Sequence, residues 1–306
     1  MLIPMKLAGG KSLLVALAAT LVFFVLLSML VYSASQFMLS HSSFRFSRVA
    51  TGDIHVDVLV VGNSRAVNLI SGRSEPPSVF NLAYNGLGRQ ATLSWIRIFF
   101  DKGNTAKTVV IETTAMYGNE AGCDGKPYWA LYGNNLAAQR RACAEDAKSA
   151  SFFPLTMFNS EQYLRALYYF TLHRHGDQNW ANEYDIPPTL CGRLPLESIF
   201  IFRRRAAHVD ESIVRHEIAD LNWWLVQHGH KTKLVFVLAP LFANQHSLPA
   251  ISDLEKIDRA MFGRDYISQA RDLGANCSDF ADSIHVGHKG RAKTTPALLR
   301  ALAART

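Results

Sequence analysis

The sequence predicts an α/β fold, a three-layer α/β/α sandwich around a parallel β-sheet. Short apolar runs rich in β-branched residues recur along the chain, as strands buried on both faces require. Amphipathic stretches long enough for helices separate these runs, and strands that alternate with helices pair in parallel through right-handed crossovers. The first run ends in a glycine and a serine, and open α/β sheets bind ligands at this carboxyl edge of their strands.

The expected elements follow from these runs and from the residues that interrupt them. Pro76 and Pro77 precede the second strand, Pro240 halts the fourth, and Gly229 ends the helix before the fourth. The expected strands are 58–61, 79–84, 108–113, 234–239 and a short final one at 276–280. The expected helices are one that begins near residue 66, those over 89–102, 210–227 and 254–273, and a closing helix after residue 287.

The amino-terminal segment predicts a single membrane anchor. Residues 12–34 contain no charged side chain and are long enough to cross a hydrocarbon core of about 30 Å. The run exceeds the apolar centre of about 7 to 15 residues found in cleaved signal peptides. Lys6 and Lys11 lie closer to the run than Arg45 and Arg48 do, so the positive-inside tendency favours an inside amino terminus. The expected order is a cytoplasmic segment 1–11, an anchor 12–34, a juxtamembrane linker 35–54 and an external domain 55–306.

The cysteines also favour an oxidising compartment. The chain has four of them, and none belongs to a C-x-x-C pair, so two disulfides explain them better than a metal site does. Of the three possible pairings we favour Cys123 with Cys143, because these two flank one polar stretch. Four buried free thiols are the alternative. The remaining disulfide candidates are Cys191 and Cys277.

Two function classes are disfavoured by charge and spacing. A net charge of +7 and a pI near 9.3 suggest nucleic acid, but the basic residues are scattered. The one run, at 203–205, is typical of a solvated face or of a contact to anionic head groups or glycans. His228, His230 and His288 have ligand-like spacings, yet no carboxylate or cysteine cluster joins them. We therefore expect no nucleic acid, no metal and no cofactor.

The stretch from about residue 115 to 202 does not continue the alternation of strands and helices. It is long, rich in tyrosine and tryptophan, and holds three of the four cysteines. We interpret it as a cap inserted after the third strand. Its aromatic side chains either stack on sugar rings beside the site or form the core of the cap itself.

A serine early in the domain and an Asp-His pair near its end are the parts of a hydrolytic triad. Ser64 follows the first apolar run after Gly62 and Asn63, and Asp282 lies three residues before His285. A serine hydroxyl needs a base to take its proton, and an imidazole needs an oriented N–H partner to act as that base. We therefore predict Ser64 as the nucleophile, His285 as general base and then acid, and Asp282 as the carboxylate that orients the imidazole.

Each part of this triad also has a simpler explanation. Serine and asparagine are favoured helix N-caps, and a junction from strand to helix needs a cap in any case. An ordinary capping aspartate beside a surface histidine would equally give the Asp282-x-x-His285 spacing. The presence of all three residue types in one domain favours the triad.

Three short blocks resemble the SGNH (GDSL-type) hydrolase and acyltransferase superfamily. They are Gly-Asn-Ser at 62–64, Asn-Leu-Ala-Tyr-Asn-Gly at 81–86, and Asp282-x-x-His285. The resemblance spans roughly residues 55–300 and is strongest to the membrane-anchored periplasmic branch that modifies cell-surface polysaccharides and teichoic acids. It implies a flavodoxin-like strand order and an oxyanion hole built from the backbone N–H groups of Ser64 and Gly86.

Two positions depart from the family's pattern. The third block of the family contributes an asparagine after the third strand, where this chain has Thr113 and Thr114, with Asn119 slightly further on. Asn63 replaces the usual aspartate. Thr113 and Asn119 are therefore the candidates for the remaining oxyanion-hole donor.

The resemblance implies an inner-membrane, single-pass serine O-acyltransferase or esterase with its large domain in the periplasm. Its substrate would be the acyl groups, acetyl foremost, of a cell-surface polysaccharide, and its partners would include a membrane-bound O-acyltransferase or an export complex. The alternative is a non-catalytic SGNH-like accessory protein of such a complex, which the missing third-block asparagine favours. A third hypothesis is an esterase that acts on lipids, which the predicted membrane anchor permits.

Overall fold

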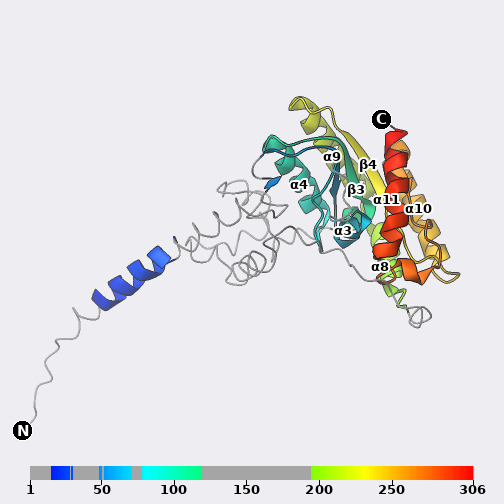
Figure 1. Ribbon diagram of the computed structural model, residues 1–306, viewed down its shortest axis with the longest axis horizontal. Helices are drawn as coiled ribbons and strands as arrows, with labels where there is room; N and C mark the ends of the chain where they lie inside the picture. The colour runs from blue at the N-terminus through cyan, green and yellow to red at the C-terminus, as the bar shows by residue number, and fades with distance from the viewer. Residues whose placement is uncertain are drawn as a thin grey trace, which may run out of the picture.

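The structure, a computed structural model, describes residues 15–27, 29, 48–49, 52–70, 78–118 and 194–305 (Figure 1). Its strands are β1 (His55–Val61), β2 (Val79–Asn81), β3 (Thr105–Glu112), β4 (Lys233–Leu238) and β5 (Tyr266–Ser268). All pairings are parallel, and the strand order is β2-β1-β3-β4-β5. The predicted α/β fold with a parallel sheet in a flavodoxin-like order is therefore confirmed.

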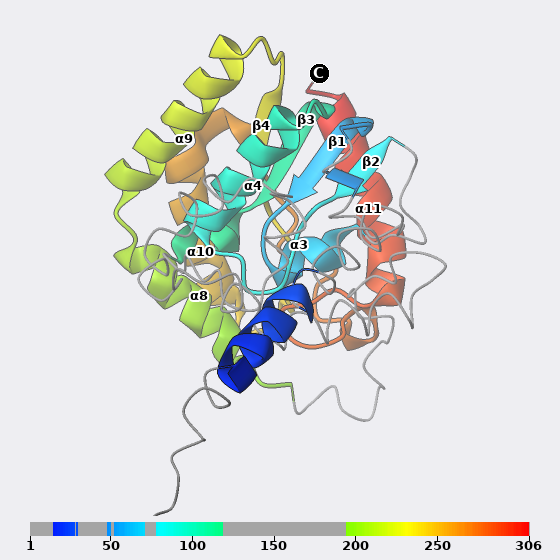
Figure 2. The same ribbon diagram turned by 90° about the vertical axis from the view of Figure 1, so that its left-hand side faces the viewer.

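Helices cover both faces of the sheet, as Figure 2 shows, with α11 on one side and α4, α9 and α10 on the other. From β1 onward, the α-helices in the described residues are α3 (Ser64–Leu69), α4 (Arg89–Asp101), α8 (Glu197–His208), α9 (Glu211–Gln227), α10 (Leu248–Phe262) and α11 (His288–Ala303). Three short 3-10 helices are η2 (Thr113–Tyr117), η5 (Gly263–Asp265) and η6 (Cys277–Asp279). The expected helices at 89–102 and 210–227 therefore form within a residue of their predicted bounds.

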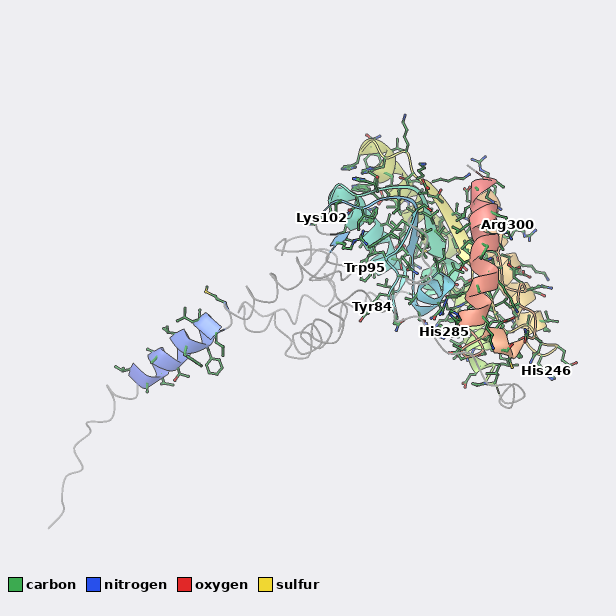
Figure 3. The ribbon with its side chains drawn as sticks, in the orientation of Figure 1. Tyr84, Trp95, Lys102, His246, His285 and Arg300 are labelled. Atoms are coloured by element: carbon green, nitrogen blue, oxygen red, sulfur yellow. The ribbon has the colours of Figure 1, made fainter. Side chains whose placement is uncertain are left out.

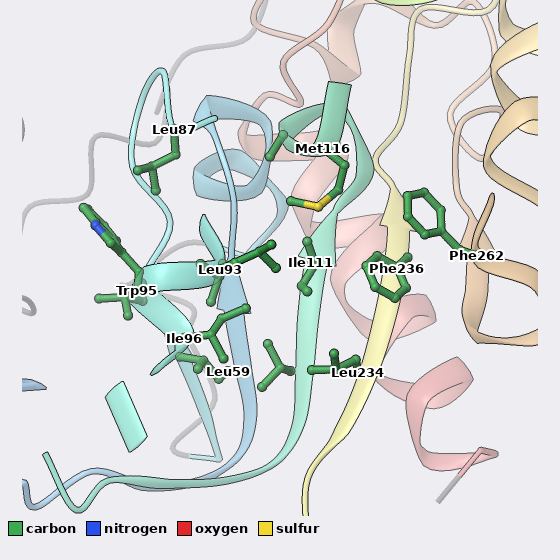
Figure 4. Packing of buried hydrophobic residues seen from close by; sticks show 14 of the residues in the cluster. Leu59, Leu87, Leu93, Trp95, Ile96, Ile111, Met116, Leu234, Phe236 and Phe262 are labelled. Carbon is green, nitrogen blue, oxygen red and sulfur yellow. The ribbon is translucent and has the colours of Figure 1, made fainter. Parts of the chain in front are cut away.

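Two hydrophobic cores lie on opposite faces of the sheet, because successive strand side chains point in opposite directions. Leu59 and Ile111 belong to the larger core, which includes residues of α4, α8, α9 and α10 (Figure 4). Val60 and Val110 belong to the second core, which includes residues of α3 and α11. The unbroken apolar runs noted in the sequence are thus buried on both sides.

The last part of the sheet differs from the prediction. The expected helix 254–273 ends at Phe262, because Gly263 takes φ +58°, a conformation that stops the helix. The chain then enters β5, which pairs with β4. The expected strand 276–280 is wrong: η6 occupies most of it, and Phe280 makes only an isolated antiparallel bridge to Val286.

Both ends of the predicted cap, where the structure describes them, belong to the α/β domain. Met116 and Tyr117 are buried in the larger core, as is Ile199 of α8, and α8 packs along α10 and against η2. The remainder of the predicted cap, 119–193, lies outside the described residues. Part of the expected linker also joins the domain, since the side chain of Asn104 bonds the Val49 carbonyl and the Ile54 N–H.

No helix within the described part of the chain is both long enough and apolar enough to cross a membrane. The expected anchor, 12–34, is described only at 15–27 and 29. Residues 15–27 form a helix in which most of the large apolar side chains are exposed; Phe23, for instance, is 62% exposed. Cys277 is buried and disulfide-bonded. Cys123, Cys143 and Cys191 lie outside the described residues, so the favoured pairing stays a prediction.

Candidate active site

The turn after β1 places Ser64 at the carboxyl edge of the sheet. Gly62 takes φ +145°, and a Cβ there would lie 3.0 Å from the Ala66 Cβ and 3.1 Å from the Glu112 Cβ, so only glycine fits without a shift. The Asn63 side chain accepts a hydrogen bond from the Arg65 N–H and is the N-cap of α3. Because Asn63 fills the capping role, the hydroxyl of Ser64 is left for another partner.

That partner is His285, which comes from the other end of the domain, 221 residues further along the chain. Its Nε2 lies 2.8 Å from the Ser64 Oγ, and its Nδ1 lies 2.7 Å from Oδ2 of Asp282. The His285 side chain is 16% exposed and that of Asp282 is 42% exposed. Figure 3 shows His285 beside α3, at the end of the sheet where Ser64 begins that helix. The three predicted catalytic side chains are therefore within hydrogen-bond distance in series.

The ionisation of Asp282 fixes how this series is protonated. Burial acts to raise its pKa, but the hydrogen bond and charge of His285 and two backbone N–H donors together lower the pKa below its usual value. Those donors are the N–H groups of Ile284, at 2.9 Å, and of His285, at 2.8 Å, which both bond Oδ1. An ionised carboxylate only accepts, so Nδ1 carries the imidazole proton. Nε2 is then free to accept the proton of Ser64.

Backbone contacts hold the loop that carries Asp282 and His285. The Ala281 N–H donates to the His285 carbonyl at 2.9 Å, which closes the loop on itself. The Phe242 N–H donates to the Ser283 carbonyl at 3.1 Å and ties the loop to the segment after β4. Asp282 therefore caps its own turn, as expected for an ordinary capping aspartate, and it also bonds the imidazole of His285.

The second sequence block lies directly beside the nucleophile. The Tyr84 N–H donates to the Gly62 carbonyl at 3.0 Å, and the buried Asn81 side chain donates to the Ala66 carbonyl at 3.0 Å. Gly86 takes φ +70° in the exposed turn that follows. The Ser64 N–H heads α3, where a helix offers no backbone acceptor. Their roles in an oxyanion hole stay predictions.

The remaining oxyanion candidates are placed less directly. Thr113 is fully buried at the start of η2, near Tyr117 and Asp258. The hydroxyl of its neighbour Thr114 accepts a hydrogen bond from the Asn63 side chain at 2.9 Å. Asn119 lies outside the described residues.

Sequence reasoning missed a buried ion pair beside the nucleophile. Nη1 of Arg65 lies 3.2 Å from Oε1 of Glu112, and both side chains are fully buried. The distance is short enough for a hydrogen bond, but the N–H is not aligned with the oxygen, so the contact is an ion pair. The signal was present in the sequence, because Glu112 follows the apolar run 109–111 at the end of β3 and Arg65 follows the serine. A charge at the end of a buried strand needs a buried partner.

Two of the three histidines with ligand-like spacing make aromatic contacts. His228 stacks on Trp224 with ring centroids 4.3 Å apart, and His230 contacts Phe100 at 4.6 Å. Among the described residues, no three His, Cys, Asp or Glu side chains gather as a metal site would need. Of the basic run, Arg203 forms a half-exposed ion pair with Asp253 of α10.

No protein-family model matches the chain, and no curated protein sequence matches it.

Proposed function

We propose that this protein is a serine O-acyltransferase or esterase that acts on acyl groups, acetyl foremost, of a cell-surface polysaccharide. The observation that supports it best is the series of hydrogen bonds from Asp282 through His285 to Ser64. These residues come from two distant parts of the chain and meet at the carboxyl edge of a parallel sheet. Coincidental capping residues would not be expected to converge with this geometry.

The first half of the proposed reaction transfers the acyl group to the protein. Ser64 Oγ attacks the carbonyl carbon of the ester, while His285 Nε2 takes the hydroxyl proton. The resulting imidazolium is stabilised by the Asp282 carboxylate. His285 then gives the proton to the oxygen of the departing alcohol as the C–O bond breaks, and an acyl-serine remains.

The second half returns the serine and delivers the acyl group. Water or a sugar hydroxyl gives its proton to His285 Nε2 and attacks the acyl carbon, and the Ser64 oxygen leaves with that proton. Water gives an esterase and a sugar hydroxyl gives a transferase. The exclusion of water from the site decides between these outcomes.

The family and location form part of the same proposal. The triad, the Gly62 turn and the strand order support membership in the SGNH superfamily. The uncharged run 12–34 supports a retained inner-membrane anchor with the domain in the periplasm. A reporter that works only in the cytoplasm is expected to be inactive when fused after residue 54. Activity of that reporter would contradict this topology.

Covalent labelling of Ser64 tests the proposed chemistry. A serine-directed phosphonate is expected to label the wild-type protein at Ser64, and the protein is expected to hydrolyse an activated acetyl ester. Ser64→Ala and His285→Ala should abolish both, whereas Asp282→Asn should lower the rate by up to about 10⁴-fold, since its role is orientation. Ser252→Ala is the matched control, because this α10 hydroxyl donates to the Leu248 carbonyl and accepts from the Arg271 guanidinium, neither of which belongs to the proposed triad.

A comparison in the cell separates the enzyme from an accessory protein. Deletion of the gene and the single change Ser64→Ala are expected to lower polysaccharide acylation equally. If Ser64→Ala leaves acylation unchanged while deletion removes it, the catalytic proposal fails and the accessory role takes its place.

A further inference from the structure

A closed ring of polar contacts links the two residues that flank the nucleophile. The Arg65 N–H donates to the Asn63 side chain, whose Nδ2 donates to the Thr114 hydroxyl. Thr114 donates from its hydroxyl and its N–H to Oε2 of Glu112, and Oε1 of Glu112 pairs with the guanidinium of Arg65. The ring therefore begins and ends on Arg65, and it holds the residues on both sides of Ser64.

The guanidinium also reaches the loop that carries the base. Nε of Arg65 donates to the Ile284 carbonyl at 3.2 Å, and Ile284 immediately precedes His285. Nη2 donates to the carbonyls of Ala239 and Pro240, which follow β4. One side chain therefore links the chain after β1, the end of β3, the chain after β4 and the catalytic loop.

The surroundings make this arrangement rigid. Arg65 is 1% exposed, Glu112 is fully buried, and the ring centroid of Phe202 in α8 lies 5.4 Å from the guanidinium carbon. Arginine is suited to this role because its planar guanidinium directs several N–H donors at fixed angles. A buried charge that already donates to three carbonyls has few other positions available.

We propose that Arg65, with Glu112 as its counter-ion, is a positioning residue that sets the distance between Ser64 and His285. This inference rests on the proposed function. Arg65 touches neither the reacting hydroxyl nor the imidazole, and it acts through the Ile284 carbonyl and through the turn that bears Ser64. Its loss should therefore slow the chemical step and leave substrate binding intact.

The test compares variants that keep the fold but lose the link. Arg65→Met combined with Glu112→Leu removes both buried charges together, so the domain is expected to fold. Its rate of phosphonate labelling at Ser64 and its kcat for the acetyl ester should fall about 10²-fold, with KM unchanged, since small misplacements of reacting groups cost that much. Arg65→Lys should recover part of the rate. Thr114→Val removes the Thr114 hydroxyl from the ring but keeps the Thr114 N–H bond to Glu112 and all contacts of the Arg65 guanidinium, so it should give a smaller loss.

Glu217→Gln is the matched control. It breaks the ion pair between Glu217 of α9 and the buried Arg89 of α4 and leaves the ring and the triad residues unchanged in sequence. It is expected to lower the melting temperature and to leave the labelling rate unchanged. Losses of labelling in the control equal to those in the Arg65 variants would reduce the role of Arg65 to general stability and overturn the proposal.

A second readout does not depend on catalysis. The Nδ1 proton of His285, hydrogen-bonded to Asp282, should give a downfield imidazole signal in proton NMR that disappears in His285→Ala. The signal should weaken or vanish in the double variant. If the wild type is labelled and the double variant matches it in rate and signal, the positioning role fails and the proposed function stands. If the wild type resists the label while the signal depends on Arg65, the proposed function fails and the positioning role stands. If neither holds, both fail.

Discussion

Two buried carboxyl groups near the same edge of the sheet differ in how burial is compensated. Glu112, at the end of β3, lies against the guanidinium of Arg65. Asp258, in α10, accepts a hydrogen bond of 2.6 Å from the neutral hydroxyl of Tyr117. Burial raises the pKa of Asp258 to about 7, and the hydrogen bond from Tyr117 offsets only part of that rise. Glu112 therefore lies beside a full opposite charge, whereas Asp258 accepts a hydrogen bond from a neutral donor.

The difference indicates what each group does. A buried ion pair is seldom the most stable choice, since apolar residues of similar volume often serve as well. The ion pair lies where four segments of the site come together. The guanidinium of Arg65 can hold these segments in fixed relative positions, because its N–H groups donate in several directions. The Tyr117–Asp258 contact joins η2 to α10 within the scaffold, where a neutral hydrogen bond is sufficient.

The largest expected effect follows from removing only one charge of the pair. Glu112→Gln leaves the Arg65 charge buried without its counter-ion, which should lower the free energy of unfolding by about 3–5 kcal/mol. Urea denaturation measures this loss as a lower midpoint at an unchanged m-value. The double change Arg65→Met with Glu112→Leu should cost clearly less than Glu112→Gln alone. A Glu112→Gln variant as stable as the wild type would show that the pair is not electrostatically coupled.

The sequence predicted the elements whose signals are local and strong. The apolar runs at β1, β3 and β4 carry enough β-branched residues to be recognised, and the N-cap Asp210 marks α9. The strand β5 was missed because it has only three residues and follows a helix. Gly263 was the available stop signal, and its positive φ explains why the helix ends there.

The sequence allowed the three proposed catalytic residues to be predicted, but not the contacts that position them. Ser64, Asp282 and His285 could be singled out because their chemistry requires those residue types. The link from Arg65 to the Ile284 carbonyl could not be predicted, because it spans 219 positions in the sequence and ends on a backbone atom. Every residue has a backbone carbonyl, so the type of residue does not indicate which carbonyl accepts this hydrogen bond. Only the fold shows which side chain lies near it.

The smaller expected effect concerns Asp258 and the direction of its pH dependence. The folded state retains a proton on Asp258 up to about pH 7, whereas the unfolded chain releases it near the ordinary pKa of 3.8. Between these values the folded state binds more protons, so stability falls as the pH rises and levels off above about pH 7. At 1.36 kcal/mol per pKa unit, the difference bounds this loss at about 4 kcal/mol.

Asp258→Asn removes the contribution of Asp258 to the pH dependence of stability, because an amide resembles the protonated carboxyl and does not titrate. Its free energy of unfolding, measured in urea at several pH values from 4 to 8, should decline less steeply with pH than that of the wild type. The two proteins should be most alike near pH 4 and differ most near pH 8, where the variant should be the more stable. Parallel pH profiles would mean that Asp258 is ionised in the folded state, and the contrast with Glu112 would then be one of geometry and not of charge.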